Sequence, residues 1–326
     1  MRQFTILVAG CGSIGQRHAR LLAERKDVDL LLADPAPANL QACAAVASAR
    51  ETFTRYGEAL QRKPDGVFIC SPNRFHVDMA LQAVDAGAGV LLEKPVADTV
   101  ADARRLLAVD AGARKKIAVG YTGRFDKLLR QIRDRVAAGE LGTIAYANAS
   151  VYTYNTLLCA KTDYREKQDW VLIVDYTHEI DFLRFILGDV IEVATMAGRV
   201  GNLAHMANPN VIEMLLRFQC GTLGSIHMDY VRHPEKRTLE LVGDKKSLEF
   251  YMPKGLLRVY THGQDDVEEI NVPFGRDDLF RDQIANFLGV LDGTQSPLVT
   301  LEDGIKALDV AETAITACRE KRTVRI

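Results

Sequence analysis

The stretch FTILVAGCGSIG at residues 4–15 decides the fold of this chain. Residues 4–9 form an apolar, β-branched run that is typical of a buried strand. Three glycines follow without a spacer, and residues 16–24 then carry helix-forming side chains. Strand, glycine turn and helix come in the order of a dinucleotide-binding unit, so this unit is predicted at the N-terminus.

Each glycine of the turn has a physical task. Gly10 permits the tight turn, Gly12 lets the backbone approach a pyrophosphate, and Gly15 lets helix and strand pack closely. The pyrophosphate is expected against the N–H groups at the helix start, next to Ser13 and Ile14. An ordinary glycine turn is the alternative, but the flanking strand and helix favour a cofactor site.

A carboxylate stands where a ribose is expected. Residues 28–33 read as a second strand that ends in Asp34, about 20 residues after the glycine turn, where an acid meets the adenosine ribose. Pro35 and Ala36 follow, with no adjacent arginine to neutralise a 2′-phosphate. NAD is therefore predicted in preference to NADP.

Bulk properties exclude several classes of protein. The chain has 326 residues, which suits two domains, and a net charge of −2. This charge gives no electrostatic footprint for nucleic acid or for an anionic membrane, and no apolar run approaches the length of a membrane span. The six cysteines form no close pair, which suits reduced thiols in a cytoplasmic protein. No histidine has metal-ligand spacing, so no metal is predicted.

Strand and helix patterns alternate through residues 1–121, which predicts a doubly wound parallel sheet with helices on both faces. Strands are expected at residues 4–9, 28–33, 66–70, 90–92 and 116–121. Helices are expected at residues 16–24, 38–49, 75–86 and 99–112. This part is predicted to be the cofactor domain.

Residues 122–326 have a different pattern, which predicts a mostly antiparallel open sheet covered on one face by helices. Strand patterns lie at residues 144–154, 190–196, 211–218, 223–231, 237–242, 247–251 and 256–260. Helical patterns lie at residues 125–138, 175–187, 278–291 and 301–319. This part is predicted to be the substrate and oligomerisation domain, with closing helices that pack back on the first domain.

Polar residues follow the strands of the predicted parallel sheet at its carboxyl edge, where ligands bind. Lys94 ends a buried strand and precedes Pro95, which fixes its backbone. A lysine held in this way is a candidate proton donor or hydroxyl anchor. An exposed loop lysine paired with Glu93 is the alternative.

A second candidate site lies at residues 175–181. Asp175 and His178 stand three apart and are expected on one face of a helix, where a carboxylate strengthens an imidazole as a base. Oxidation of an alcohol needs such a base, because the hydroxyl proton leaves with the hydride. A structural histidine at a helix start is the alternative. Arg124, Tyr152, Tyr164 and Trp170 are candidate polyol contacts, or equally interface core.

Together these residues resemble the glucose–fructose oxidoreductase/inositol dehydrogenase (Gfo/Idh/MocA) family along essentially the whole chain. The resemblance rests on residues 10–15, Ser71-Pro72-Asn73 with His76, Glu93-Lys94-Pro95, residues 120–125 and residues 175–181. Glu-Lys-Pro after the fifth strand is its most specific mark.

The resemblance implies a Rossmann domain, an α/β domain with an open sheet, and dimers or tetramers formed through that sheet. It implies that Lys94 anchors the reacting hydroxyl and the cofactor ribose, that His178 is the acid/base, and that Asp175 assists it. Ser71, Pro72, Asn73, His76 and Glu93 are implied to lie at the cofactor. Many family members place the acid four residues before the histidine, a position that is Val174 here.

The sequence thus predicts an NAD-dependent oxidoreductase that acts on a sugar or cyclitol hydroxyl. One alternative keeps NAD tightly bound for epimerisation, elimination or glycoside cleavage. Another is a ligand-sensing regulator that has the fold without the chemistry.

Overall fold

The computed structural model describes residues 2–154, 169–202, 208–273 and 275–326. The chain divides into two compact units, Met1–Phe125 with Arg276–Leu308 and Asp126–Gly275 with Asp309–Ile326. The division falls inside helix α13 (Leu301–Glu320). A domain boundary after residue 121 stays a prediction.

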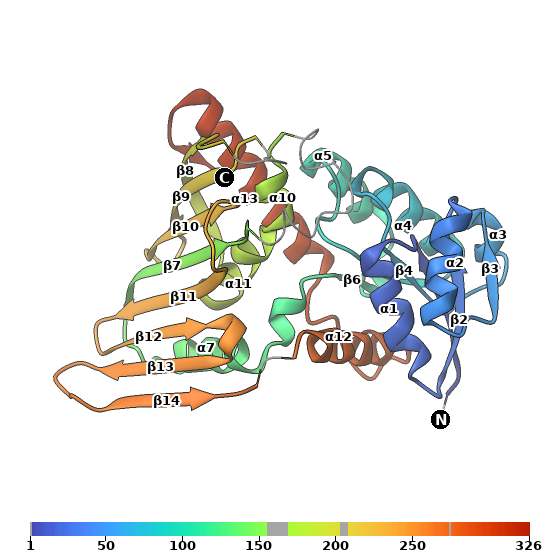
Figure 1. Ribbon diagram of the computed structural model, residues 1–326, viewed down its shortest axis with the longest axis horizontal. Coiled ribbons are helices and arrows are strands. Elements are labelled where there is room, and N and C mark those ends of the chain that lie inside the picture. Colours follow the sequence, from blue (N-terminus) through green and yellow to red (C-terminus); the bar gives the residue numbers. More distant parts are fainter. Residues whose placement is uncertain (1, 155–168, 203–207, 274) are drawn as a thin grey trace. The chain divides into compact units, whose positions relative to one another are not determined.

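The first unit contains a six-stranded sheet in the order β3-β2-β1-β4-β5-β6. Figure 1 labels its strands β2, β3, β4 and β6. All of its strand pairs are parallel, which confirms the predicted sheet. Its strands are β1 (Phe4–Ala9), β2 (Val28–Ala33), β3 (Glu51–Phe53), β4 (Gly66–Ile69), β5 (Gly89–Leu92) and β6 (Ile117–Val119). The strand order reverses between β1 and β4, and ligands of such sheets bind at this point.

The helices of this unit lie between these strands along the chain, except for α12, which comes after the last of them. They are α1 (Ser13–Ala23), α2 (Pro37–Val46), α3 (Tyr56–Leu60), α4 (His76–Asp85), α5 (Val100–Ala103), α6 (Ala111–Arg114) and α12 (Arg276–Leu291). Short 3₁₀ turns lie at η1 (Asn73–Phe75), η2 (Arg104–Ala108) and η3 (Thr122–Phe125). The predicted continuous helix at residues 99–112 is wrong, because Asp110 is extended and caps α6 as a new helix through the N–H groups of Gly112 and Ala113.

Helix α12 is part of the core of the first unit although it lies far from the sheet strands in sequence. The rings of Phe287 in α12 and Phe68 in β4 meet edge to face at 5.3 Å. A Cβ atom at Gly66 would lie 2.8 Å from Leu291, so glycine in this strand makes room for the helix.

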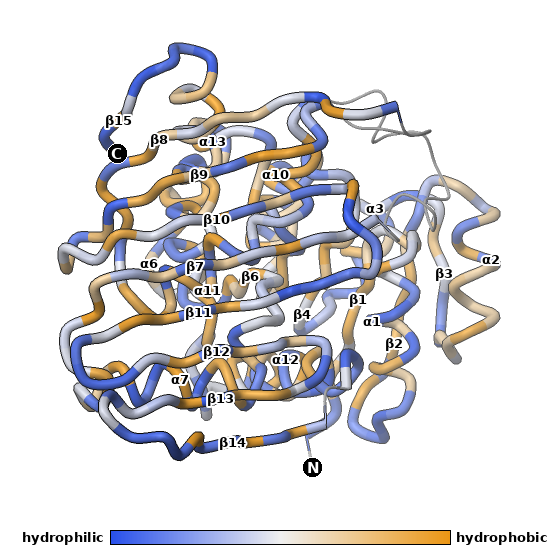
Figure 2. The backbone as a smooth tube through the Cα atoms, turned by 60° about the vertical axis from the view of Figure 1, so that its left-hand side comes forward, coloured by the Kyte–Doolittle hydropathy of each residue, from blue (hydrophilic) through white to orange (hydrophobic). Residues whose placement is uncertain are grey.

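The second unit contains a nine-stranded sheet in the order β14-β13-β12-β11-β7-β10-β9-β8-β15 (Figure 2). The β7–β10 pair is parallel and the others are antiparallel, which confirms the mostly antiparallel sheet. Its strands are β7 (Ile144–Tyr152), β8 (Val190–Gly198), β9 (Val211–Phe218), β10 (Leu223–Asp229), β11 (Lys236–Gly243), β12 (Lys246–Tyr251), β13 (Leu256–Thr261), β14 (Val267–Asn271) and β15 (Val324–Arg325).

Side chains alternate between the two faces of this sheet. In β9, Met214, Leu216 and Phe218 are buried, whereas the residues between them are exposed. Helices α7 (Lys127–Ala137), α10 (Val171–Asp175) and α11 (Thr177–Leu187) belong to this unit, and α10 and α11 contact the central strands. A 3₁₀ turn, η4 (Met252–Lys254), precedes β13. Within the part of the chain that the structure describes, no helix is long and apolar enough to cross a membrane.

Candidate active site

The glycine turn after β1 has no room for side chains at two of its three glycines. Gly10 has a φ of +96°, and a Cβ there would lie 2.6 Å from the carbonyl carbon of Cys70. A Cβ at Gly15 would lie 1.8 Å from the carbonyl oxygen of Gly10. The turn and the first helix therefore pack closely, as the sequence predicted.

Gly12 is different, because a Cβ there would meet no atom within 4 Å. It is the N-cap of α1, where no side chain caps the helix and no acidic residue lies in the first turn. Open space beside an uncapped helix start, next to Ser13 and Ile14, suits an anionic group. The turn thus fits the pyrophosphate of a dinucleotide.

Asp34 lies at the carboxyl end of β2, where it is 7% exposed. Its Oδ2 accepts the N–H of Cys11 at 2.7 Å, and its Oδ1 accepts the N–H of Ala36 at 2.8 Å. The side-chain amide of Asn39 donates to both oxygens, at 3.2 and 3.3 Å. Asp34 therefore fastens the glycine turn to the second strand, a role that sequence spacing did not reveal.

His76 ties together the two other loops at this edge of the sheet. Its Nδ1 lies 2.9 Å from the carbonyl oxygen of Pro95 and its Nε2 lies 2.8 Å from that of Ser71. The residue is 1% exposed, and burial lowers the pKa of its imidazole despite these two carbonyls. His76 thus positions the loops that carry Pro72, Asn73 and Lys94. Pro72 is exposed, and Asn73 and Lys94 are partly exposed.

Glu93 is a buried carboxylate directly before Lys94. Its Oε1 lies 2.9 Å from Nε2 of His18, on α1, and its Oε2 accepts the N–H of Lys94 at 3.3 Å. Burial alone raises the pKa of Glu93, but the hydrogen bond from His18 and the charges of His18 and Lys94 outweigh burial and hold that pKa below its usual value. His18, which the sequence gave no reason to select, is part of this site.

The second unit holds Asp175 and His178, but in a different arrangement from the predicted one. The expected single helix at residues 175–187 is wrong: Asp175 is the last residue of α10, and His178 lies in the first turn of α11. Tyr176 separates the helices with a φ of −114° and a ψ of 29°, so Asp175 and His178 do not share one helix face.

Two tyrosine hydroxyls hold this helix break in place. The hydroxyl of Tyr230 donates to Oδ2 of Asp175 at 2.9 Å, and that of Tyr176 donates to Oγ1 of Thr153 at 2.7 Å. Sequence reasoning missed Tyr230, which lies after β10 and is fully buried.

Helix α11 is anchored by the neighbours of His178. Thr177 and Glu179 are both 0% exposed, and Nε of Arg237 donates to the Glu179 carboxylate at 2.5 Å. His178 itself is partly exposed. The ion pair of the fully buried Glu179 holds the helical turn that carries the partly exposed imidazole of His178.

The remaining candidate contacts lie in separate places. Arg124 is 5% exposed and pairs with Asp303 at 3.0 Å within the first unit. In the second unit, Arg319 lies over the ring of Trp170, at 5.9 Å from its centroid. Tyr152 stacks on His227 at 4.8 Å. Tyr164 lies outside the described residues.

Tyr152 and His178 belong to different surroundings in the second unit. Val151 is buried beneath the helices, so alternation along β7 turns Tyr152 to the opposite, open face of the sheet. Arg232 lies over its ring there, at 4.6 Å. The structure thus groups Asp175 with two tyrosines, and Tyr152 with His227 and Arg232.

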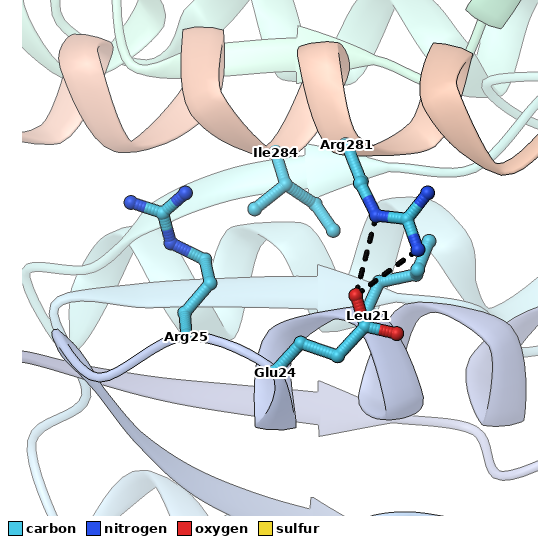
Figure 3. Close-up of a pocket in the computed structure, with 5 residues that line it drawn as sticks. All are labelled: Leu21, Glu24, Arg25, Arg281 and Ile284. Atoms are coloured by element: carbon cyan, nitrogen blue, oxygen red, sulfur yellow. Dashed lines mark hydrogen bonds and ion pairs between the residues drawn. The ribbon is translucent and has the colours of Figure 1, made fainter.

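A small pocket of about 190 Å³ lies between α1 and α12 in the first unit (Figure 3). It is lined by Leu21, Glu24, Arg25, Arg281 and Ile284. Glu24 and Arg281 pair with each other across it at 3.1 Å. These residues lie at the end of α1 opposite the glycine turn, so the pocket is not part of the cofactor site. Across the described ranges, no cluster of histidine, cysteine and acidic residues could hold a metal ion.

Two family models cover most of the chain. Residues 4–121 match "Oxidoreductase family, NAD-binding Rossmann fold", and residues 133–326 match "Oxidoreductase family, C-terminal alpha/beta domain", both of the Gfo/Idh/MocA group.

Individual relatives match over nearly their whole length. The rhizopine catabolism protein MocA of Rhizobium meliloti is 26% identical over 96% of this chain and 95% of its own. An inositol 2-dehydrogenase of Rhizobium meliloti (strain 1021) is 23% identical, over 97% of each chain. The crystal structure of an oxidoreductase domain protein from Kribbella flavida superposes with a TM-score of 0.88 at 23% identity, over 100% of each chain.

Proposed function

Since the chain belongs to the Gfo/Idh/MocA oxidoreductase family, we propose that it transfers a hydride between a nicotinamide and a secondary hydroxyl or ketone. The substrate class in this proposal is a sugar, a cyclitol or a derivative of either. It is supported by the likeness to an inositol 2-dehydrogenase along the whole chain. The observation that carries the proposal is Lys94, mounted on a buried carboxylate at the carboxyl edge of a sheet whose glycine turn fits a dinucleotide.

The proposed cofactor is NAD rather than NADP. Asp34 supports this choice, because its carboxylate lies at the end of β2 and would repel a 2′-phosphate. Gly10, Gly12, Ser13, Ile14 and Gly15 would hold the pyrophosphate. The bound nicotinamide would supply the hydride chemistry, and the protein would orient the substrate and move the proton.

Three side chains divide the proton transfer in this proposal. Lys94 donates hydrogen bonds to the reacting oxygen and stabilises negative charge on it. His178 takes the hydroxyl proton during oxidation and returns it during reduction. Asp175 assists His178 from the helix break, where the hydroxyl of Tyr230 fixes its carboxylate. Trp170 is kept as a substrate contact.

Two earlier candidates are not supported as substrate contacts by their surroundings. Arg124 is buried against Asp303, and Tyr152 stands on the open face of the second sheet. The open face favours a role of that surface in assembly, and a homodimer or homotetramer formed through it is part of the proposal.

The test is a panel of sugars and cyclitols incubated with the purified protein and NAD or NADP, followed by the absorbance of the reduced nicotinamide. Reduction of NAD by at least one polyol is expected, with slower reduction of NADP. No absorbance change across a broad panel would contradict the dehydrogenase proposal. Cofactor that co-purifies and turns over without added NAD would instead favour internal redox chemistry such as epimerisation.

The same assay tests Lys94. Lys94→Ala should lower turnover at least about 100-fold, the usual contribution of a positioned proton donor, while NADH still binds. Lys115→Ala is the matched control, because Lys115 is an exposed lysine of the same unit and should leave turnover unchanged. Equal turnover in Lys94→Ala and Lys115→Ala would remove Lys94 from the mechanism.

A further inference from the structure

A buried pair of side chains links the first helix to the end of β5. Nε2 of His18 and Oε1 of Glu93 are 2.9 Å apart, the His18 side chain is 0% exposed, and Glu93 is 9% exposed. The two residues come from elements far apart in sequence, and Glu93 directly precedes Lys94.

Packing alone does not account for a histidine at position 18. Its ring lies edge-on between Phe68 and Phe280, with both centroid distances 5.1 Å. Within the described residues, its Nδ1 is buried without a hydrogen-bond partner. An orphaned ring nitrogen among phenylalanines is destabilising, so an apolar side chain would pack better there. Among the residues that the structure describes, Glu93 is the polar partner of the ring.

The Glu93 carboxylate is fitted closely on its other side. Its Oε2 accepts the N–H of Lys94 at 3.3 Å. A Cβ at Gly120 would lie 2.9 Å from that Oε2 and 3.0 Å from Cδ, so only glycine leaves room for the carboxylate there. His18, Gly120 and the backbone of Lys94 thus fix this carboxylate.

The charge of Glu93 reaches Lys94. The interaction between them lowers the pKa of Glu93, although burial and then the bond from His18 have the larger effects on it. Electrostatic interactions are reciprocal, so the ionised Glu93 stabilises the ammonium form of Lys94. A substitution of His18 that reduces the negative charge on Glu93 would therefore make the ammonium form of Lys94 less stable.

We propose that His18 and Glu93 are positioning residues for Lys94. His18 holds the Glu93 carboxylate in place and favours its ionised form, and Glu93 in turn holds the backbone and the ammonium group of Lys94. The proposal rests on the proposed function for the catalytic use of Lys94, but its structural content can be tested without substrate or cofactor. Neither His18 nor Glu93 is proposed to touch the reacting atoms.

The test measures the reactivity of the Lys94 amine in the full-length protein. Acetic anhydride at limiting concentration acylates lysines in their neutral form, and peptide mass spectrometry across a pH series gives the extent at each site. Exposed Lys63 and Lys115 of the same unit are internal references. Lys94 is partly exposed, so the reagent reaches it.

Glu93→Gln keeps the shape of the side chain and removes the charge. Acylation of Lys94 near neutral pH, relative to the two references, is expected to rise at least about threefold. His18→Phe, which preserves an aromatic ring among phenylalanines but not the donor, should raise it similarly. His18→Gln, which keeps an N–H donor, should restore the wild-type extent. A merely structural His18 would lower the melting temperature without moving this pH profile.

The double variant His18→Phe/Glu93→Gln tests whether His18 acts on Lys94 through Glu93. If His18 acts through Glu93, the double variant has the Lys94 profile of Glu93→Gln alone. An unchanged Lys94 profile in Glu93→Gln overturns the proposal, whether or not His18→Phe folds. A profile in the double variant that adds the two single effects also overturns the order proposed.

The outcome is distinguishable from a failure of the proposed function. A shifted Lys94 profile in a protein that oxidises no polyol would sink the dehydrogenase proposal and leave the positioning role standing. Full polyol oxidation by the wild type, with the same Lys94 profile in every variant, would support the dehydrogenase proposal and overturn the positioning role.

Discussion

His76 shows how one buried side chain can make a site depend on pH. Both of its ring nitrogens face main-chain carbonyl oxygens, one from Ser71 and one from Pro95. A neutral imidazole has one N–H, so only one of these contacts is a hydrogen bond at a time. A charged ring would satisfy both, but burial opposes the charge, and the pKa of His76 falls below its ordinary value of 6.5.

We therefore expect the first unit to lose stability as the pH falls below about 6.5. Above that pH the imidazole is neutral in both the folded and the unfolded chain. Below it the unfolded chain takes up a proton that the folded chain resists, which costs at most about 1.4 kcal/mol per pH unit. Thermal unfolding of the wild type and of His76→Gln, measured from pH 7.5 to 5.5, checks this.

In that experiment the melting temperature of the wild type should fall more steeply with acid than that of His76→Gln. His262→Gln is the matched control, since His262 is exposed in the second unit and should leave the acid slope unchanged. Parallel acid slopes for wild type and His76→Gln would show that His76 titrates as an ordinary histidine.

Single residues divide clearly into those that sequence could select and those that it could not. Gly10 and Gly15 were predicted because their roles follow from backbone geometry. Asp34 was selected from a fixed distance along the chain, but its bond to the glycine turn was not predicted. The contacts of His18, Gly120 and Tyr230 were missed because they depend on partners brought close only by folding. A histidine that shares a helix face with buried apolar residues has no sequence signal that separates it from core.

The turn between β1 and α1 is the element on which cofactor binding depends. Two of its glycines have different tasks in the structure. A side chain at Gly15 would strike the backbone of Gly10, whereas a side chain at Gly12 would meet only open space. Gly15 is thus needed for folding, and Gly12 leaves room for a ligand.

Two alanine substitutions should separate these tasks. Gly12→Ala is expected to keep the wild-type melting temperature and to weaken NADH binding at least about tenfold, because the methyl group fills the space of the pyrophosphate. Gly15→Ala should lower the melting temperature by about 5 °C or more, since overpacking of this kind costs about 1–3 kcal/mol. Fluorescence titration with NADH and thermal unfolding measure the two effects.

Gly57→Ala provides the control for both measurements, because a Cβ at Gly57 also meets nothing within 4 Å and Gly57 lies in α3, outside the turn. Wild-type NADH affinity in Gly12→Ala would contradict the assignment of the turn to the pyrophosphate.

Elements with a continuous apolar run were predicted well, including the short strands β4, β5 and β6. β1, β2 and β9 have the predicted bounds. β3 and α3 were not predicted, because residues 51–53 are not an apolar run and the five residues of α3 give too little periodicity. The breaks at Asp110 and at Tyr176 were also missed: helical periodicity continues across them, and side-chain bonds decide where each helix ends.

For the whole molecule, the predicted family, the fold class and the oxidoreductase class are confirmed, because they rest on motifs distributed along the entire chain. The predicted assembly stays a prediction, and the surface of the second sheet bears on it. Met196, Leu215, Leu223 and Tyr146 share the open face by strand register, and they are 80%, 64%, 49% and 39% exposed.

An apolar group on one sheet face indicates a surface that associates with another protein surface. The same face carries His227, whose Nε2 lies 2.7 Å from Asp229 and whose Nδ1 lies 2.5 Å from Glu213. The bond to Asp229 and the nearby Glu213 raise the pKa of His227 although burial opposes them. Because these polar groups are already paired, we expect the apolar side chains to supply most of the free energy of association.

We expect the wild type to be a dimer or tetramer at micromolar concentration and Leu215→Arg to be a monomer. The substitution would bury one guanidinium group without a partner for each protomer, two in a dimer and four in a tetramer, and this burial opposes association. Sedimentation velocity measures the change, and circular dichroism should show that the fold is intact. Val46→Arg introduces the same charge at an apolar position of α2 that is 46% exposed, and it should leave the assembly unchanged. A monomeric wild type, or a Leu215→Arg variant that assembles as Val46→Arg does, would exclude the open face as the interface.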